Sequence, residues 1–592
     1  MLPFMRSKNA TKEYSITKFG GINKSFSQGI NEFSDGYNMT SEFFPALSSV
    51  RGNEVFEKTQ NVICGAGFYD KLYTLEQDEN DPDNLHIMCD GDSLASFETE
   101  KEGKRKAEFM KDEFLVIPDN VIFHTDSSEI SMGSFCQTIN KENTLEKYMA
   151  ENPSATNFPN PSLTWYSSHL AHNAIIAEQT KYSYSGQSYI LYNFSLSGQF
   201  KPGDVITLKM NVAPLGDSTV SERQTYIHKM EKGLTLKIKD LTEITHYTAS
   251  GNKITEIISI VFEDNSIDLD IFDEVLVMNV TIEKTMPDFN DICCFENRMW
   301  AVTDSEICAS KLADCSQWEN FTADQYGTLP SSSFRTGVES DGSFTAITAY
   351  NGNVMAFKED CIHKIYGSEP AEYKLNRINC PGVKKGCRDT VAVAGGILFY
   401  MSKSGIYSYN GSSFKLISNP INIGEYEVVT ANGDERYYRL VAKKGNETSV
   451  FVYDTRYGLW NKNLTENDIC FLIQTDNGLV AVNEREKLKV NTGDYGNWSF
   501  TLSFGKKEFS SRHICSVFAR YTLKESGNLK IQIRNKHDTY TIADTSAKAN
   551  NFPLRITIPV SCARDSDLIF SGTGEFTLIS LTVRYKETGI ND

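Results

Sequence analysis

The chain has 592 residues, of which 40% are hydrophobic and 11% aromatic, and its formal net charge at pH 7 is −18. This length is too great for one compact core, so we expect two to four domains, and the hydrophobic content excludes a disordered chain. The acidic charge excludes a general nucleic-acid binder, which needs a basic surface to displace counterions. It is compatible with a conduit that nucleic acid crosses without adhering.

No targeting or membrane segment stands out. Residues 1–8 lack an apolar signal core, and no segment approaches the roughly 18 consecutive apolar residues of a membrane span, so we expect a soluble protein made in a cytosol, with no stable membrane insertion. The 13 cysteines lie within apolar runs, which favours buried reduced thiols. Several glycosylation sequons occur, among them those at Asn38, Asn320, Asn410 and Asn497, and we interpret them as chance matches.

The first part of the chain combines a polar arm with short strands. Residues 1–55 are polar, with glycines that permit sharp turns, and we expect a docked N-terminal arm. From Val62 onward, short runs rich in β-branched and aromatic residues assign residues 56–149 to the first blades of a β-propeller. An amphipathic helix is expected at Lys141–Met149.

The short-run pattern is then interrupted. Residues 150–286 begin with a proline-rich linker and continue with longer strands in which apolar and polar residues alternate, as in Val205–Met210. This alternation predicts a β-sandwich. Because loop tips tolerate domain insertions, we expect the propeller to close around this inserted β-sandwich.

Between Asp291 and Pro420 a unit of four short strands is repeated three times, with tight turns such as Asn351–Gly352. Recurring four-stranded units predict a β-propeller with one blade per unit. In the first unit we place the fourth strand at Trp318–Phe321. Two weaker units follow, so residues 287–497 hold the remaining blades, six or seven in total. Longer strands in residues 498–592 predict a C-terminal β-sandwich, and the predicted fold class is all-β.

Metal-binding patterns are weak. His169 and His172 lie three residues apart without an adjacent carboxylate, and we favour an ordinary histidine pair over a metal site. The acidic run Asp78–Asp83 could offer oxygen ligands to calcium, but Pro82 stands where an EF-hand loop needs glycine, which favours a solvated hairpin loop. Two cysteine pairs spaced by seven are interpreted as thiols rather than zinc ligands: Cys308 with Cys315 and Cys380 with Cys387.

Catalytic motifs are equally sparse. The chain has no Gly-x-Ser-x-Gly elbow, P-loop or Gly-x-Gly-x-x-Gly motif, and Ser340–Phe344 is a single faint echo of the repeated box of sialidase-type propellers. Four arginines near blade starts could line a pocket, although ion pairs at the surface explain them as well: Arg298, Arg335, Arg388 and Arg436. Four tryptophans are assigned to core packing: Trp300, Trp318, Trp460 and Trp498. We predict no catalytic, cofactor-binding or metal-binding residues and therefore no enzyme.

Two groups of residues resemble one protein family. The first is the N-terminal string Phe19–Asn23, Gly36–Met39 and Pro45–Gly52, and the second is a blade phrase within Val354–Gly367 and Gly396–Gly411. Both are similar to strings in bacteriophage tail proteins of the tail nozzle (tail tubular protein B) type. The resemblance covers residues 15–55 and 290–420 and leaves both sandwiches unassigned.

This resemblance implies a structural protein of the virion tail, assembled in the host cytoplasm. Several copies form a ring below the portal and adaptor in that family, and their propellers surround a DNA channel. The implied partners are further copies of the chain, adaptor and fibre proteins, and genomic DNA that passes without specific binding. We also expect an acidic channel wall that keeps DNA mobile. A contact with the host surface is compatible with this role.

Two alternatives stay open. A carbohydrate- or receptor-binding propeller predicts exposed aromatic side chains on loops. A glycan-cleaving enzyme needs a carboxylate pair about 5 to 9.5 Å apart.

Overall fold

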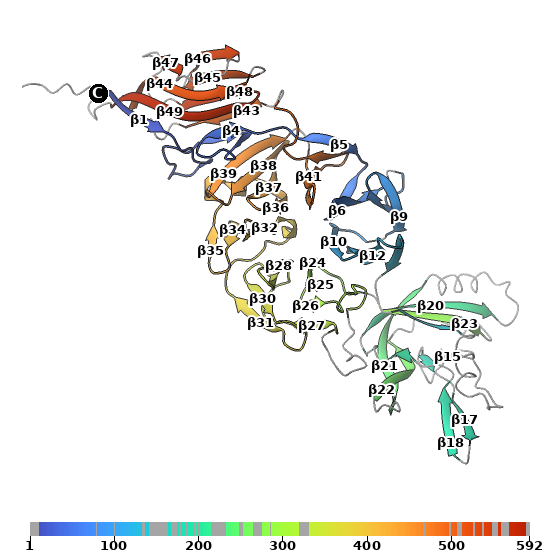
Figure 1. Ribbon diagram of the computed structural model, residues 1–592. Coiled ribbons are helices and arrows are strands. Elements are labelled where there is room, and N and C mark those ends of the chain that lie inside the picture. The colour runs from blue at the N-terminus through green and yellow to red at the C-terminus, as the bar shows by residue number, and fades with distance from the viewer. Residues whose placement is uncertain are drawn as a thin grey trace, which may run out of the picture.

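The structure is a computed structural model of the chain (Figure 1). It describes most of residues 11–132, 286–318, 331–495, 499–505 and 512–587, together with the strands between residues 136 and 284. Helical structure in these parts is confined to short 3-10 turns, namely η2 (Arg388–Thr390), η3 (Asn419–Ile421) and η4 (Ile423–Glu425). No helix among the described residues has the length and apolar character of a membrane span. The predicted helix at Lys141–Met149 lies outside the described residues.

Seven four-stranded antiparallel sheets are arranged around one axis as the blades of a propeller (Figure 1). Blade 1 consists of β6 (Val62–Phe68), β7 (Lys71–Gln77), β8 (Asn84–Cys89) and β9 (Asp92–Glu98). Blade 2 consists of β10 (Lys106–Met110), β11 (Glu113–Ile117), β12 (Val121–His124) and β13 (Glu129–Met132). Blade 3 consists of β24 (Asp291–Phe295), β25 (Arg298–Val302), β26 (Glu306–Ala309) and β27 (Phe334–Gly337).

The remaining blades follow in chain order. Blade 4 consists of β28 (Ala346–Tyr350), β29 (Asn353–Phe357), β30 (Ile362–Tyr366) and β31 (Lys374–Ile378). Blade 5 consists of β32 (Ala392–Ala394), β33 (Ile397–Ser402), β34 (Gly405–Tyr409) and β35 (Phe414–Leu416). Blade 6 consists of β36 (Glu427–Gly433), β37 (Tyr437–Lys444), β38 (Glu447–Asp454) and β39 (Leu459–Thr465). The predicted all-β propeller is confirmed, with the higher of the two expected blade numbers.

The seventh blade closes the ring with a strand from the other end of the chain. It consists of β40 (Phe471–Thr475), β41 (Gly478–Val482), β42 (Glu486–Lys489) and β5 (Glu54–Lys58), in that order. Lys487 of β42 is fully buried, and its Nζ lies 2.5 Å from Glu57 Oε1 of β5 and 3.6 Å from Glu76 Oε1 of blade 1. One buried ammonium therefore joins the closing strand to the blades on both sides of the seam.

Blades 2 and 3 pack directly on each other although β13 ends at Met132 and β24 begins at Asp291. Their shared core contains Leu115 and Ile122 from blade 2 and Ile292 and Met299 from blade 3, all fully buried. The inserted module thus leaves the ring between two neighbouring blades without opening it. The prediction of a fourth strand at Trp318–Phe321 is wrong, because β27 (Phe334–Gly337) pairs with β26 and Trp318 instead packs its ring 4.4 Å from that of Phe289.

The inserted module is built around one long strand that pairs with a different neighbour at each end. In β21 (Leu234–Tyr247), the first residues pair with β20 (Val205–Pro214), and the rest pair with β22 (Lys253–Phe262) after a register shift at Ile238. Such shifts form the corners of sandwiches. The other strands are β14 (Cys136–Asn140), β15 (Thr164–Tyr166), β16 (Ala174–Ile176), β17 (Gln179–Tyr184), β18 (Gln187–Tyr192), β19 (Leu196–Ser197) and β23 (Val275–Lys284).

Pairing of β14 with β23 places residues 136–140 in the inserted module, whereas the sequence assigned them to the first blades. An isolated five-residue strand carries no sequence signal for its partner, because that partner lies more than 130 residues away.

The C-terminal sandwich contains strands from both ends of the chain. One sheet has the order β3 (Met39–Thr40), β4 (Leu47–Ser49), β49 (Phe576–Glu587), β44 (Arg512–Leu523) and β47 (Leu554–Thr557), and β1 (Thr11–Ile16) also pairs with β49. The second sheet has the order β2 (Asp35–Tyr37), β43 (Ser499–Ser503), β48 (Asp567–Thr573), β45 (Asn528–Arg534) and β46 (Thr539–Ser546). Phe19, Phe33 and Met39 of the arm are buried in its core. The arm is therefore part of this sandwich.

We predict that Lys487→Met lowers the free energy of unfolding of the propeller by about 3–5 kcal/mol, because the partly buried carboxylates of Glu57 and Glu76 lose the cation that they share at the seam. Denaturant unfolding followed by tryptophan fluorescence measures this, since Trp300, Trp318 and Trp460 are buried in the propeller. The control is Lys524→Met, whose ion pair with Glu575 is exposed and is worth at most about 1 kcal/mol. Equal effects of the two substitutions would contradict this account of the seam.

Candidate functional site

Those candidates for metal chemistry that lie in the described part of the chain do not form a metal site. Among the described residues, no three or more His, Cys, Asp or Glu side chains come close enough to hold a metal ion. His169 and His172 lie outside the described residues. In the acidic run, the Asp78 carboxylate accepts a hydrogen bond from Asn80 N at 2.8 Å, and this bond is the main reason that the pKa of Asp78 is lowered. The Asp78 carboxylate therefore stabilises the turn of this hairpin loop.

The four arginines near blade starts are dispersed. Arg298 is buried, and its guanidinium donates to Ser310 O at 2.8 Å and to Ser332 O at 2.6 Å, which ties down both ends of a long connection in blade 3. Arg335 pairs with Glu306 across β26 and β27 at 2.5 Å. Arg388 binds the backbone of Lys104, and Arg436 binds the backbone of Ser41 in the arm. The arginines do not share a pocket in the part of the chain that the structure describes.

One short basic segment, Lys101–Lys106, holds the centre of the propeller together. It precedes β10, and each of its four cations pairs with a different carboxylate: Lys101 with Asp288 at 3.2 Å, Lys104 with Asp389 at 2.5 Å, Arg105 with Asp119 at 2.8 Å and Lys106 with Asp291 at 2.6 Å. Burial alone would lower the pKa of Lys106, but Asp291 and Glu108 outweigh it and the pKa is raised. The fully buried Asp291 also accepts a hydrogen bond from Ile347 N at 2.8 Å, so this carboxylate joins blades 2, 3 and 4.

Arg388, just before β32 of blade 5, extends the same network across the axis. Its guanidinium donates to the backbone oxygen of Asn290, which precedes blade 3, and to Lys104 O at 2.5 Å. Lys104 Nζ in turn lies 3.2 Å from Val429 O of blade 6. Groups from blades 2, 3, 5 and 6 therefore meet at this end of the propeller. Within one copy of the chain, the axis is crossed by protein at this end.

The opposite end of the propeller carries the turns between the first and second strands of the blades. These turns are neighbours, since Asp476 N donates to Tyr69 O and Gly395 N donates to Asp434 O. Five exposed carboxylates stand in them, at Asp70, Asp112, Glu296, Glu435 and Asp476. In contrast to the carboxylates around the basic segment, none of the five has an ion-pair partner among the described residues. We call these five residues the acidic turn face.

The faint box Ser340–Phe344 lies against a buried histidine. Ser340 Oγ is 2.8 Å from His363 Nε2, and Lys358 Nζ donates to Ser340 O at 2.5 Å while lying 4.8 Å from the centre of the Phe344 ring. Burial lowers the pKa of His363 to about 4, with further contributions from Lys358 and Arg377. A second pair of this kind, His124 with Ser131 at 2.9 Å, stands in blade 2, so a serine–histidine contact in this protein is a packing feature.

The N-terminal residues Phe19–Asn23 and Gly36–Met39 pack the arm onto blade 6. A Cβ atom at Gly21 would lie 2.4 Å from Trp460 O, so only glycine permits this approach, and Ile22 N donates to that oxygen at 2.7 Å. Asn38 is buried; its Nδ2 donates to Ser499 O and its Oδ1 accepts from Leu464 N. The structure uses Asn38 as a connector between the arm, the C-terminal sandwich and blade 6.

A buried carboxylate fixes the next part of the arm. Asp454 has no exposed surface and accepts hydrogen bonds from Ser41 Oγ at 2.6 Å and from Arg436 Nη2 at 2.7 Å. Arg436 also donates to Ser41 O at 2.9 Å. Above this network, the Phe44 ring stacks on that of Tyr457 at 3.9 Å between centroids. Phe43 is 57% exposed and Tyr457 37%. We call Phe43, Phe44 and Tyr457 the aromatic ledge.

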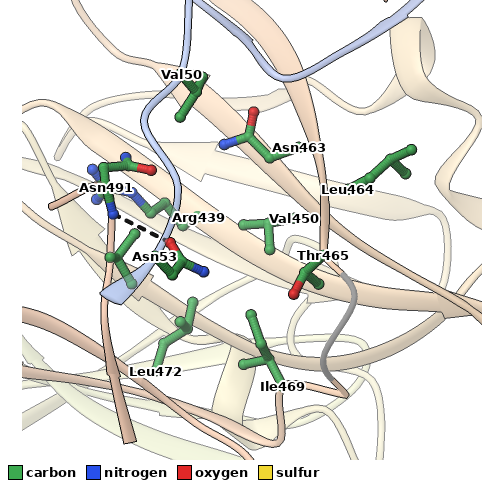
Figure 2. A pocket seen from close by; sticks show the side chains of 11 residues that line it. Val50, Asn53, Arg439, Val450, Asn463, Leu464, Thr465, Ile469, Leu472 and Asn491 are labelled. Carbon is green, nitrogen blue, oxygen red and sulfur yellow. Dashed lines mark hydrogen bonds between the residues drawn. The ribbon is translucent and has the colours of Figure 1, made fainter. Parts of the chain in front are cut away.

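A small cavity lies where the arm crosses the seam between blades 6 and 7 (Figure 2). Val50 and Asn53 of the arm, Asn463 of blade 6 and Leu472 of blade 7 are among its lining residues, and Asn491 N donates to Asn53 Oδ1 at 3.2 Å. Its volume is about 30 Å³, room for one or two water molecules. This cavity is too small for a substrate.

The remaining sequence candidates are structural. Trp300, Trp318 and Trp460 are buried in blade cores, and Trp498 lies outside the described residues. The described cysteines are free thiols, buried or half-buried, including Cys308, Cys315, Cys380 and Cys387.

Comparison with known proteins adds no functional assignment. No family model and no curated protein matches the chain. Among solved structures, Hsv2 of Kluyveromyces lactis is 14% identical with a TM-score of 0.24, and the match covers 37% of this chain and 62% of that chain. The Dos1 propeller is 10% identical with a TM-score of 0.25, over 49% and 79% of the two chains. An exo-β-1,3-galactanase of Phanerochaete chrysosporium, solved with galactose, is 9% identical with a TM-score of 0.21, over 51% and 96%. Such distant likenesses carry no argument about activity.

Sequence reasoning missed the basic segment, the acidic turn face and the aromatic ledge. A signal existed for the first, because four of the six residues Lys101–Lys106 are basic. The other two features unite residues from distant parts of the chain, and their members look ordinary one by one.

We predict that acid destabilises the blade 3–blade 4 contact through His363. Its pKa is about 4 in the folded chain and 6.5 in the unfolded one, so its contribution to stability is complete above pH 6.5 and is lost as the pH falls to 4, by up to about 3 kcal/mol. In denaturant unfolding at stepped pH, His363→Gln removes this part of the pH dependence, whereas the control His124→Gln retains it. An unchanged pH dependence in His363→Gln would contradict the assignment.

Proposed function

We propose that the chain is a non-catalytic structural subunit of a bacteriophage tail, in which several copies form a nozzle ring that conducts DNA and anchors neighbouring adaptor and fibre proteins. This places it in the virion tail, after assembly in the host cytoplasm. The proposal starts from the residues of the arm and blades that resemble the tail nozzle family.

The observation that carries the proposal is the placement of the two sandwiches. The inserted sandwich leaves the propeller between blades 2 and 3, and the C-terminal sandwich is clamped to blade 6, on the opposite side (Figure 1). A rigid body with different modules on two opposed sides is suited to head-to-tail contacts, which close into a ring when the rotation between copies permits.

The distribution of charge supports a DNA path between copies. The axis within one copy is crossed by the network of Lys104, Arg388 and Asp389, so a conduit would form where several copies surround a common lumen. The acidic turn face, with its unpaired carboxylates, would repel duplex DNA if it lined that lumen and would keep the DNA mobile.

A carbohydrate- or receptor-binding propeller is the second candidate. The aromatic ledge favours it, because two of its three rings are exposed on loops. We do not propose a glycan-cleaving enzyme, because the cavity between the arm and blades 6 and 7 is lined by no carboxylate.

We predict that the purified chain forms closed rings with an open lumen, visible by negative-stain electron microscopy. Replacing residues 134–285 by a short Gly-Ser linker should leave a folded propeller, since blades 2 and 3 share a core without the module, but should abolish rings. The linker variant is checked by circular dichroism, and antibody labelling of phage particles that carry this sequence should mark the tail. A protein that stays monomeric at high concentration and is absent from particles would refute the proposal.

A further inference from the structure

The aromatic ledge is unusual because it is both exposed and rigid. Single exposed aromatic side chains are common on protein surfaces, and Tyr69 and Phe56 are examples here. The ledge instead unites Phe43 and Phe44 of the arm with Tyr457 of the turn between β38 and β39, more than 400 residues away. A grouping of this kind, rimmed by polar residues, marks an interaction site.

The network beneath the ledge fixes both loops. On the arm side, Ser41 binds Asp454 and Arg436, and Phe44 N donates to Ser41 O at 3.0 Å. On the propeller side, Arg456 N donates to Asp454 Oδ1 at 3.0 Å and Gly458 N donates to Asp454 O at 2.8 Å. The buried carboxylate of Asp454 therefore binds Ser41, Arg436 and Arg456, and two main-chain bonds fix Phe44 and Gly458 beside them. Fixing a binding surface before its ligand arrives reduces the entropy lost on binding.

The guanidinium of Arg436 adds to this support. Its Cζ lies 5.5 Å from the centre of the Tyr457 ring and 4.8 Å from that of Tyr437. Because Arg436 is already paired with Asp454, it holds the Tyr457 ring in place and leaves little net positive charge for an anionic ligand.

The dimensions of the ledge select the class of partner. A stable protein interface needs roughly 800 Å² from each partner, and three rings, of which one is half-covered by another, offer far less. The residues next to the rings in sequence carry exposed hydrogen-bonding groups of both charges, at Glu42 and Arg456. A flat apolar surface with mixed polar groups at its edge matches a sugar ring, which has an apolar C–H face and hydroxyl groups around its perimeter.

We propose that the aromatic ledge is a glycan-binding site, in which the C–H face of a pyranose ring packs on Phe43 and Tyr457 while Glu42 and Arg456 bind its hydroxyl groups. No covalent step is involved. The site goes beyond the structural role proposed above, and it would let each copy of the chain contact a polysaccharide surface while the two sandwiches make the contacts between copies.

The test uses the full-length chain and an array of bacterial surface oligosaccharides that contain hexose, N-acetylhexosamine and deoxyhexose units. The best ligand on the array is then titrated by calorimetry. We expect binding that weakens about tenfold or more in Phe43→Ala and in Tyr457→Ala. Tyr457→Phe keeps the ring and should retain most of the affinity.

The matched control is Phe56→Ala, which removes another exposed aromatic side chain. Phe56 belongs to the closing strand β5 of blade 7, and its ring centre lies 5.5 Å from Lys489 Nζ of β42. Glycan binding by this variant should be unchanged, and thermal melts establish that all variants are folded. Binding to no glycan, or equal binding by ledge and control variants, would overturn the proposal. Loss of rings in Phe43→Ala or Tyr457→Ala, with no glycan bound by the parent chain, would overturn it in favour of a contact between copies. Absence of rings in the unaltered chain would contradict the proposed nozzle function and would leave the glycan-binding result to decide this proposal.

Discussion

The return of the N-terminal strand β5 to the last blade is the constraint on which the rest of the structure depends. Blade 7 has three strands from residues 471–489, and it reaches four only when β5 pairs with β42. The buried ammonium of Lys487 then binds Glu57 of β5 and Glu76 of blade 1. The arm that precedes β5 also supplies strands and core residues to the C-terminal sandwich, so one N-terminal segment both closes the ring and anchors that sandwich.

The charges of the molecule are separated in a way that matches this architecture. At one end of the propeller, the cations of Lys101–Lys106 are matched by carboxylates from several blades, where they hold the axis closed. At the other end, the acidic turn face has no such partners among the described residues. Five exposed carboxylates therefore lie on one face of the propeller. This asymmetry is useful to a protein that must avoid adhering to nucleic acid.

Local signals in the sequence were enough to predict the hairpins, and long-range pairings were not. The Asn351–Gly352 turn, with both residues at positive φ, identifies a hairpin from two residues. The partner of β5 lies more than 400 residues away in the sequence, and the partner of β14 more than 130. The strand β27 follows a long connection. No local pattern therefore identifies these three pairings. The same limit applies to the aromatic ledge, whose rings meet only after the arm has docked on blade 6.

Hydrogen–deuterium exchange of β5 tests the closed ring most directly. If β5 is the fourth strand of blade 7, the amides of residues 54–58 that bond to β42 should exchange as slowly as those of β41 in the same sheet, and Lys487→Met should accelerate both. Fast exchange of β5 with slow exchange of β41 in the unaltered chain would show that the arm is not part of the blade, and would contradict the account of a ring closed by its own N-terminal strand.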